Sequence, residues 1–282
     1  MGQRIPLLEV KDFTLQFKQY GRGLKQIETR VISGFTLDVH AGEIVAVVGA
    51  SGSGKSLLAH AILGILPSNA ATGGSLKFKG EELSQSLKER LRGKEISLIP
   101  QSVSYLDPLM TTGKQIESPL RKAANAVKSV MNRFQLGDDA KNKYPFQLSG
   151  GMARRVLIGT ALTSGAELVI ADEPTPGLHK SMVDETLGSL KELAALGRGV
   201  LMITHDIDLA FVVADRIAVF NKGLTVEVAD AKAFEASPDN VKHPYSKALW
   251  HALPQNGFHS VRGKDYGEEI DAGCDAGEED DA

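Results

Sequence analysis

The chain has 282 residues, of which 42% are hydrophobic and 24% charged, a composition typical of a soluble globular protein that buries a core. Its formal net charge of -3 includes eight carboxylates between residues 266 and 282, and the mildly basic remainder is too weakly charged to favour a nucleic-acid partner. The single cysteine, Cys274, excludes a disulfide framework and a cysteine-bound metal cluster, and no apolar run approaches the ~20 residues that cross a bilayer.

Runs of β-branched and apolar residues predict strands at 5–10, 35–39, 44–48, 96–99, 168–171, 200–203, 216–220 and 224–228. Between about 102 and 165 no strand is clear and several helices are plausible, so this stretch is expected to be an inserted helical subdomain. A helix is expected over 185–196, where Leu187, Leu190 and Ala194 share one side. The alternation of strand and helix favours an α/β fold, a parallel sheet with helices on its faces.

A glycine-rich segment follows the strand predicted at 44–48. Residues 44–56 read IVAVVGASGSGKS, which matches G-x-x-x-x-G-K-[ST] between a predicted strand and a helix-compatible segment. The backbone N–H groups of such a loop surround phosphate oxygens, and the helix that follows adds the positive end of its dipole. The predicted phosphate-binding residues are Gly49, Ala50, Ser51, Gly52, Ser53, Gly54, Lys55 and Ser56. Lys55 is expected to reach the β- and γ-phosphates and Ser56 to ligate Mg²⁺.

Two adjacent carboxylates end the apolar run at 168–171. The segment LVIADE predicts a buried strand that delivers Asp172 to the magnesium ion and Glu173 to a water molecule attacking the γ-phosphate. A strand end carrying two solvated acids would be the simpler interpretation if the phosphate loop were absent. With that loop in the same chain, a metal ion and a reactive water are the expected partners of the two carboxylates.

A second anion-binding helix start is predicted at LSGGM, residues 148–152. Ser149, Gly150 and Gly151 precede a helical stretch and are suited to present a hydroxyl and two N–H groups to a γ-phosphate. The chain then has two phosphate sites and only one lysine-bearing loop. A head-to-tail pair of chains, in which each LSGGM closes over the nucleotide held by the partner's loop, explains why one chain has two phosphate sites and one such loop.

Over roughly residues 5–255 the chain resembles the ATP-binding cassette (ABC) ATPases. GASGSGKS is similar to the Walker A loop, IPQS to the Q-loop, LSGGM to the signature, LVIADE to Walker B, PTPGLH to the D-loop, and ITHD to the switch-histidine segment. The resemblance implies a P-loop NTPase core of parallel sheet with an antiparallel β part at the N-terminus and the inserted helical subdomain. It implies ATP and Mg²⁺ as ligands and ATP hydrolysis as the reaction.

The resemblance also assigns further roles. Gln101 would contact Mg²⁺ or the attacking water and report the nucleotide state to a membrane partner, and His205 would hydrogen-bond the γ-phosphate. Tyr20 and Phe17 are the candidates for the aromatic that stacks on adenine, with the insertion GRGLKQIETR leaving the choice open.

The sequence departs from the family pattern at His179, where the D-loop ordinarily ends in aspartate. Because that aspartate reaches across the dimer, the histidine puts the cross-contact in doubt and suggests that the chain pairs with a different ATPase subunit, giving two unequal sites. Met152, in place of the more frequent glutamine of the signature, is taken as a tolerated variation.

The segments QSVSYLDPLMTTGKQI and HPYSKALWHALP (243–254) look like the ATPase subunits of dipeptide, oligopeptide, nickel and metallophore importers. An ordinary amphipathic C-terminal helix is the simpler explanation of the second segment. Membership of that group implies two transmembrane permease subunits, a second ABC ATPase subunit (identical or different), an extracytoplasmic substrate-binding protein acting indirectly, and a peripheral position at the cytoplasmic face of the membrane.

Two other functions compete with the importer. A soluble ABC module acting on nucleic acid or ribosomes would lack a permease partner, and a metabolite kinase with a phosphate loop would leave LSGGM without a purpose. The expected domain organisation is a nucleotide-binding domain over 1–255, with the helical subdomain at about 102–165, and an acidic, disordered tail over 256–282.

Overall fold

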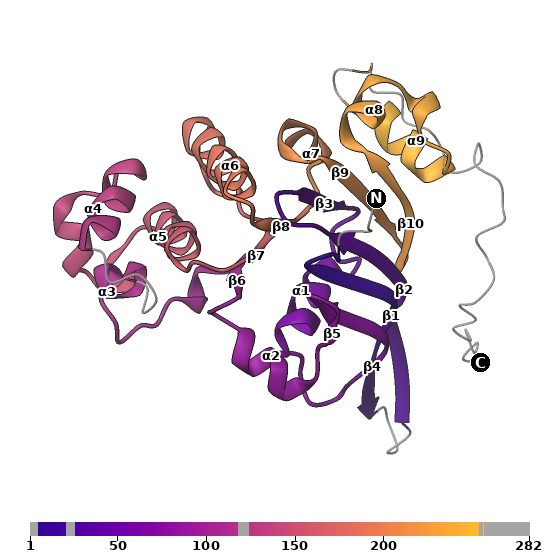
Figure 1. Ribbon diagram of the computed structural model, residues 1–282, viewed down its shortest axis with the longest axis horizontal. Helices are drawn as coiled ribbons and strands as arrows, with labels where there is room; N and C mark the ends of the chain where they lie inside the picture. Colours follow the sequence, from indigo (N-terminus) through magenta and orange to yellow (C-terminus); the bar gives the residue numbers. More distant parts are fainter. Residues whose placement is uncertain (1–4, 21–25, 118–123, 254–255, 257–282) are drawn as a thin grey trace, which may run out of the picture.

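A computed structural model describes residues 5–20, 26–117, 124–253 and 256 (Figure 1), so the predicted acidic tail lies almost wholly outside the described residues. One sheet has the strand order β5-β4-β1-β2-β10-β9-β3-β8-β7-β6. The strands are β1 (Leu8–Tyr20), β2 (Gln26–Val39), β3 (Ile44–Val48), β4 (Ala70–Phe78), β5 (Glu81–Glu82), β6 (Ile96–Ile99), β7 (Leu168–Asp172), β8 (Gly199–Thr204), β9 (Arg216–Asn221) and β10 (Leu224–Asp230).

The helices alternate with the later strands. They are α1 (Lys55–Leu63), α2 (Gln85–Leu91), α3 (Thr112–Ile116), α4 (Ala124–Arg133), α5 (Gly150–Thr163), α6 (Lys180–Ala195), α7 (Ile207–Val213), α8 (Ala231–Ala236) and α9 (Pro244–His251), with short 3-10 turns at Val103–Tyr105, Asp138–Asn142, Pro145–Gln147 and Pro238–Asn240. The described residues between 102 and 165 contain no strand, and α3, α4 and α5 stand apart from the sheet in Figure 1.

The parallel half of the sheet is formed by β9, β3, β8, β7 and β6. Every residue of β3, β7 and β8 is buried, as expected for strands covered on both faces. Because parallel strands end at the same edge, the segments that follow β3, β6, β7 and β8 meet there. That edge receives the phosphate loop, Gln101, Glu173 and His205.

Side chains alternate between two apolar layers along β3. Ile44, Ala46 and Val48 join a core with residues of α5, α6, α7 and α8, whereas Val45 and Val47 join a core with residues of α1, α2, β1 and β2. The prediction of helices on both faces of the parallel strands is therefore confirmed. The helix predicted over 185–196 is α6, which begins earlier, at Lys180.

The antiparallel half is larger than the sequence predicted. The strands expected at 5–10 and 35–39 are parts of the long hairpin β1–β2, the insertion GRGLKQIETR contributes to β2, and β4 and β5 were not predicted. These strands were missed because exposed polar residues of β1 and β2 and two glycines in β4 interrupt the apolar pattern that predicts a strand. Gly74 lies beside a bulge at Asp12, where an added Cβ would sit 2.3 Å from the Asp12 carbonyl oxygen.

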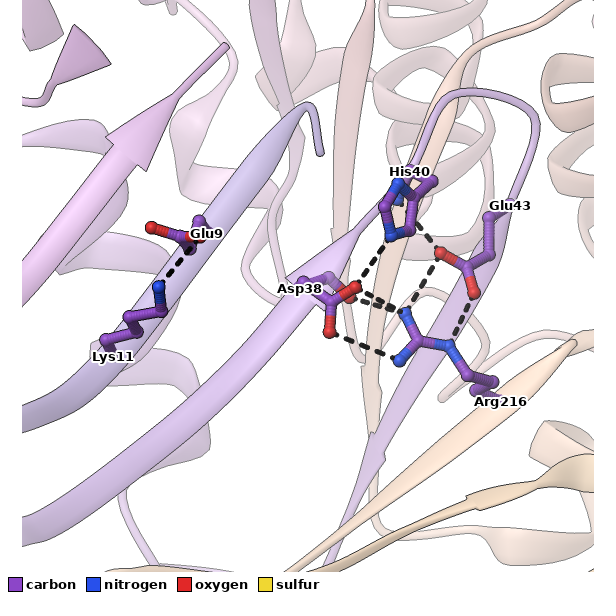
Figure 2. A network of polar contacts seen from close by, with 6 residues as sticks. All are labelled: Glu9, Lys11, Asp38, His40, Glu43 and Arg216. Atoms are coloured by element: carbon purple, nitrogen blue, oxygen red, sulfur yellow. Dashed lines mark hydrogen bonds and ion pairs between the residues drawn. The ribbon is translucent and has the colours of Figure 1, made fainter. Parts of the chain in front are cut away.

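An ionic cluster joins the two halves at the edge opposite the phosphate loop (Figure 2). The guanidinium of Arg216, which opens β9, contacts Asp38 near the end of β2 and Glu43 just before β3, with Nε 2.6 Å from Glu43 Oε1. His40 Nε2 lies 2.8 Å from Asp38 Oδ2. Burial raises the pKa of Asp38, but hydrogen bonding and attraction from Arg216, with a contribution from His40, lower it overall.

Replacing Arg216 with methionine is expected to lower the free energy of unfolding by about 2 kcal/mol at pH 7, because two half-buried carboxylates would lose their cation. Since the pKa of Asp38 is depressed in the fold, its stabilising contribution is present above the unfolded pKa and disappears as pH falls through the folded one. The variant should therefore lose less stability than the parent on acidification below about pH 4.

Urea denaturation of the full-length chain measures both effects. Lys11→Met is the matched control, since Lys11 makes an exposed ion pair with Glu9 next to the cluster (Figure 2) and should change stability by about 0.5 kcal/mol or less. Equal effects of the two substitutions would contradict a special role for Arg216.

Candidate functional site

The phosphate loop has the geometry that its glycines predict. It leaves the sheet at the end of β3, and Gly54, in a left-handed conformation with φ 98°, immediately precedes α1. An added Cβ on Gly54 would lie 2.7 Å from Val31 Cγ1, and one on Gly49 would lie 2.1 Å from the carbonyl oxygen of Phe220. The backbone therefore has no room for side chains at these two positions, and the N-terminus of α1 opens toward the loop.

Lys55 folds back over this loop. Its Nζ donates to the carbonyl oxygens of Gly49 and Ala50 at 2.7 Å each, and lies 3.3 Å from Ser53 Oγ. Burial lowers the pKa of Lys55, while the nearby charges of Glu173 and Asp172 act in the opposite direction. An ammonium held only by neutral carbonyl and hydroxyl oxygens is suited to exchange them for charged phosphate oxygens.

Ser56 and Asp172 lie together as a candidate magnesium site. Ser56 Oγ donates to Asp172 Oδ1 at 3.0 Å, and only 3% of Asp172 is exposed. Burial raises the pKa of Asp172 and the charge of Glu173 adds to this, opposed by the Ser56 hydrogen bond and by His60 and Lys55. A hydroxyl and one carboxylate are hard oxygen donors, and Mg²⁺ completes its shell with substrate phosphates and water, so the donor set fits.

Glu173 is held in an unusual backbone conformation. Its φ is 46°, in the left-handed region, and its N–H donates to the Ile203 carbonyl oxygen at 2.9 Å. Its Oε1 accepts from the backbone N–H of His205 at 3.0 Å and lies 2.8 Å from His205 Nδ1. Its Oε2 is buried and has no hydrogen-bond partner among the described residues. An oriented carboxylate with one free oxygen is suited to polarise a water molecule.

Lys55, Ser56 and Glu173 line one cavity of about 290 Å³, and Asp172 lies behind Ser56 outside its lining. Its lining residues are Ser51, Gly52, Gly54, Lys55, Ser56, Leu57, Gln101 and Glu173. The predicted phosphate, water-activating and Q-loop residues are thus brought together at the carboxyl edge of the parallel strands. His205 reaches the cavity through its contact with Glu173, with 56% of its side chain exposed.

The signature residues are not part of this cavity. Ser149 caps the N-terminus of α5, where its Oγ accepts from the N–H of Met152 at 3.3 Å, and both Ser149 and Gly150 are exposed. Gly151 lies in the first turn of the same helix. Within the described part of one chain, this exposed helix start and the phosphate loop form separate surfaces.

The adenine-stacking prediction is untested. Tyr20 is the last residue of β1 and pairs with Gln26 at the end of the hairpin, and its side chain lies outside the description. Phe17 is partly buried and packs against the core shared by β1, β2 and α1. The D-loop histidine, His179, caps α6 and lies exposed, with Nδ1 3.2 Å from Ser181 Oγ.

Two contacts of the site were not predicted from the sequence. Arg154, on α5, donates to the backbone carbonyl oxygens of Gln101 and Glu173. Tyr245, on α9 in the segment 243–254, packs against the apolar core, and its phenol oxygen faces the N–H of Ala50 in the phosphate loop, where burial raises its pKa. Both residues contact main-chain groups, which leave no residue-type signal in the sequence.

Comparison with known proteins places this geometry in a family. The model of the ABC transporter family matches residues 32–176. The oligopeptide transport ATP-binding protein OppD of Bacillus subtilis (strain 168) is 34% identical over 265 residues, which cover 88% of this chain and 72% of that protein. The dipeptide transport ATP-binding protein DppD of Lactococcus lactis subsp. cremoris (strain MG1363) is 35% identical, covering 88% and 74%.

A solved structure agrees in fold. The ATP-binding cassette MJ0796, as a dimer in a post-hydrolysis state bound to ADP and Pi, superposes with a TM-score of 0.69 at 25% sequence identity and covers 79% of this chain and 98% of that one. No helix in the described residues is long and apolar enough to span a membrane. The chain belongs to the ABC transporter family, as an ATP-binding cassette ATPase related to the oligopeptide and dipeptide transport ATP-binding proteins.

Proposed function

We propose that the cavity at the carboxyl edge of the parallel strands binds ATP·Mg²⁺ and hydrolyses the nucleotide to power import through separate permease subunits. The observation that carries this proposal is that Lys55, Ser56 and Glu173 line that cavity. Asp172 contacts Ser56 and His205 contacts Glu173 directly behind the lining. The proposed domain that performs this work spans 1–255, includes the helical subdomain at about 102–165, and is followed by the acidic tail at 256–282.

Each polar group has a proposed task. The N–H groups of residues 49–56 and the ammonium of Lys55 bind the phosphates, and Ser56 with Asp172 would hold the metal ion, joined by Gln101 directly or through water. The metal ion neutralises charge on the phosphates when it is bound. Glu173 accepts a proton from the attacking water through its free Oε2, and His205 orients Glu173 and hydrogen-bonds the γ-phosphate.

A second cassette completes the proposed site. The exposed start of α5 at Ser149, Gly150 and Gly151 offers a hydroxyl and free N–H groups that no group of its own cavity uses, and the neighbour MJ0796 is a dimer. We infer that this helix start caps the nucleotide of a partner cassette. His179 favours a partner of different sequence, in which the two sites are unequal.

The proposed membrane contact lies beside the Q-loop. A mostly apolar cavity of about 350 Å³ opens between α1, β6, the Val103–Tyr105 turn and α5, and Tyr105 lines it. Leu109 is 87% exposed, and Met110 lines an adjoining cavity that Tyr105 also borders. Exposed apolar groups around a hollow fit a short helix of a permease subunit. Two such permeases would hold the cassette pair at the cytoplasmic face of the membrane.

Peptides are the proposed cargo because the relatives are named for oligopeptide and dipeptide transport. Nickel ions and metal–metallophore complexes are the narrower alternative cargo that the segments at 101–116 and 243–254 suggest. An extracytoplasmic binding protein and the permeases would select among them, so uptake assays with the neighbouring permease pair and a panel of peptides and metal chelates distinguish the two.

The rival function is a soluble ABC module that works on nucleic acid or ribosomes without a membrane channel. The apolar groups around Tyr105 and the mild charge of the body favour a permease over an anionic polymer.

Substituting Lys55 by alanine is expected to weaken ATP binding about 10- to 100-fold, because the loop would lose its charged donor to the phosphates. Titration with a fluorescent ATP analogue measures the dissociation constant. Lys88→Ala removes a partly buried lysine on α2, outside the cavity, and should leave affinity unchanged. Normal ATP binding by the Lys55 variant would refute the phosphate-loop assignment.

Replacing Glu173 with glutamine is expected to lower kcat at least about 100-fold while ATP binding persists, because the amide accepts no proton from water. Turnover is followed by phosphate release, and gel filtration with ATP shows whether the variant is trapped as a dimer of identical chains. Glu167→Gln alters an exposed carboxylate beside the opposite end of β7 and should leave kcat unchanged. Unchanged turnover in the Glu173 variant would remove it as the proton acceptor.

Leu109→Asp is expected to weaken association with the permease pair at least about tenfold and to leave the chain's own ATP binding intact, because a charge would replace an exposed apolar contact. Co-purification from membranes measures it. Leu196→Asp changes a 67% exposed leucine after α6 and should have no effect. If the permease pair co-purified equally with both variants, this docking surface would be refuted. If no permease co-purified with the unaltered chain, the soluble module would be favoured.

A further inference from the structure

A buried arginine lies behind the proposed catalytic groups. Arg154 belongs to the second turn of α5, five residues after Ser149, and only 8% of it is exposed. No carboxylate forms an ion pair with it among the described residues. Its Nη1 instead donates to the Glu173 carbonyl oxygen at 2.8 Å, and its Nη2 donates to the carbonyl oxygen of Gln101.

Burying a guanidinium is costly unless nearby groups compensate its charge and accept hydrogen bonds from its N–H groups. Burial lowers the pKa of Arg154, and the charges of Glu173 and Asp172 oppose that effect. The carbonyl contacts and this attraction together keep the cation in place. A long cationic side chain is used here to grip two main-chain atoms, which a planar fork of donors does better than a single ammonium.

The two carbonyls belong to neighbouring strand ends. Gln101 follows β6 and Glu173 follows β7, and these strands pair in parallel, with Ile99 opposite Ala171. One guanidinium therefore ties together the Q-loop, the Walker B strand end and the helix that begins with the signature. Among the described residues, no other side chain hydrogen-bonds the backbone of both Gln101 and Glu173.

Glu173 needs such support because its backbone is strained. A non-glycine residue at φ 46° is in a sparsely populated conformation, which persists only where surrounding contacts hold it. Its N–H is fixed by Ile203, its carboxylate by His205, and its carbonyl oxygen by Arg154. Of these, the Arg154 contact is the one that comes from α5.

We propose that Arg154 is a positioning residue for ATP hydrolysis: it holds Gln101 and Glu173 in the arrangement that orients the attacking water, and it makes that arrangement depend on the position of α5. This inference rests on the proposed roles of Glu173 and Gln101. It adds a contact within one chain through which displacement of the signature helix changes turnover at that chain's own site.

The test compares Arg154→Met, Arg154→Lys and Glu173→Gln in the full-length chain with ATP and Mg²⁺. Arg154→Met should lower kcat about tenfold or more while the dissociation constant for a fluorescent ATP analogue changes less than about threefold, since misplacement of reacting groups affects turnover and not ground-state binding. Arg154→Lys restores one cationic donor and should recover part of kcat. In a Glu173→Gln background, Arg154→Met should have little further effect.

Arg133→Met is the matched control, because Arg133 also links a helix of the 102–165 region to the rest of the chain, through Glu185 and Glu192 of α6, without contacting Gln101 or Glu173. Its kcat should stay within about twofold of the parent. The proposal would be overturned if Arg154→Met left kcat unchanged, or if it lowered kcat and ATP affinity equally. If Arg154→Met does not fold, the same two criteria apply to Arg154→Lys. If Glu173→Gln retained full turnover, the proposed role of Glu173 would fail instead, and absence of ATP hydrolysis by the unaltered chain would refute the proposed function.

Discussion

Two buried cations, Lys55 and Arg154, face two buried carboxylates at the carboxyl edge of the sheet, and the proposed site depends on the balance of these charges. Lys55, Asp172 and Glu173 are all less than a tenth exposed, and each would be costly to bury alone. Their attraction compensates only in part, since burial still lowers the pKa of Lys55 and raises that of Asp172. In the proposed function, a triphosphate and a divalent cation would bring further opposite charges to this cavity, the phosphates meeting Lys55 and the metal ion meeting Asp172.

The parallel strands make this arrangement possible because their middle residues are mostly apolar and buried. β3, β7 and β8 contain only buried residues, so polar groups gather at the strand ends. The cavity occupies one end, and the cluster around Arg216 occupies the other, where it joins β2, β3 and β9. The ionic cluster fixes the antiparallel strands to the core at a distance from the chemistry, so the two polar regions are separated by the apolar length of β3.

The sequence predicted the parts of the fold whose signals are local. Uninterrupted apolar runs predicted β3 and β7 nearly to the residue. The charged residues that line the cavity are Glu173, directly after β7, and Lys55, at the end of the loop that follows β3. It failed for β4, where Gly73 and Gly74 interrupt the pattern because they pack against β1. It also failed for Arg154, since a contact with a backbone carbonyl depends on where two distant strands end and not on which residues stand there.

Helix α5 links the two ends of the proposed mechanism. Its exposed first turn at Ser149 is free to meet a partner's nucleotide, while Arg154, in the second turn, grips the backbone behind its own nucleotide cavity. A helix is stiff over this length, so pulling its N-terminus toward a partner also moves the arginine that holds Glu173. In the proposed dimer, closure on one nucleotide would therefore change the geometry at the other. Because the backbone of Glu173 is strained, a small displacement there would have a large effect on the orientation of the attacking water.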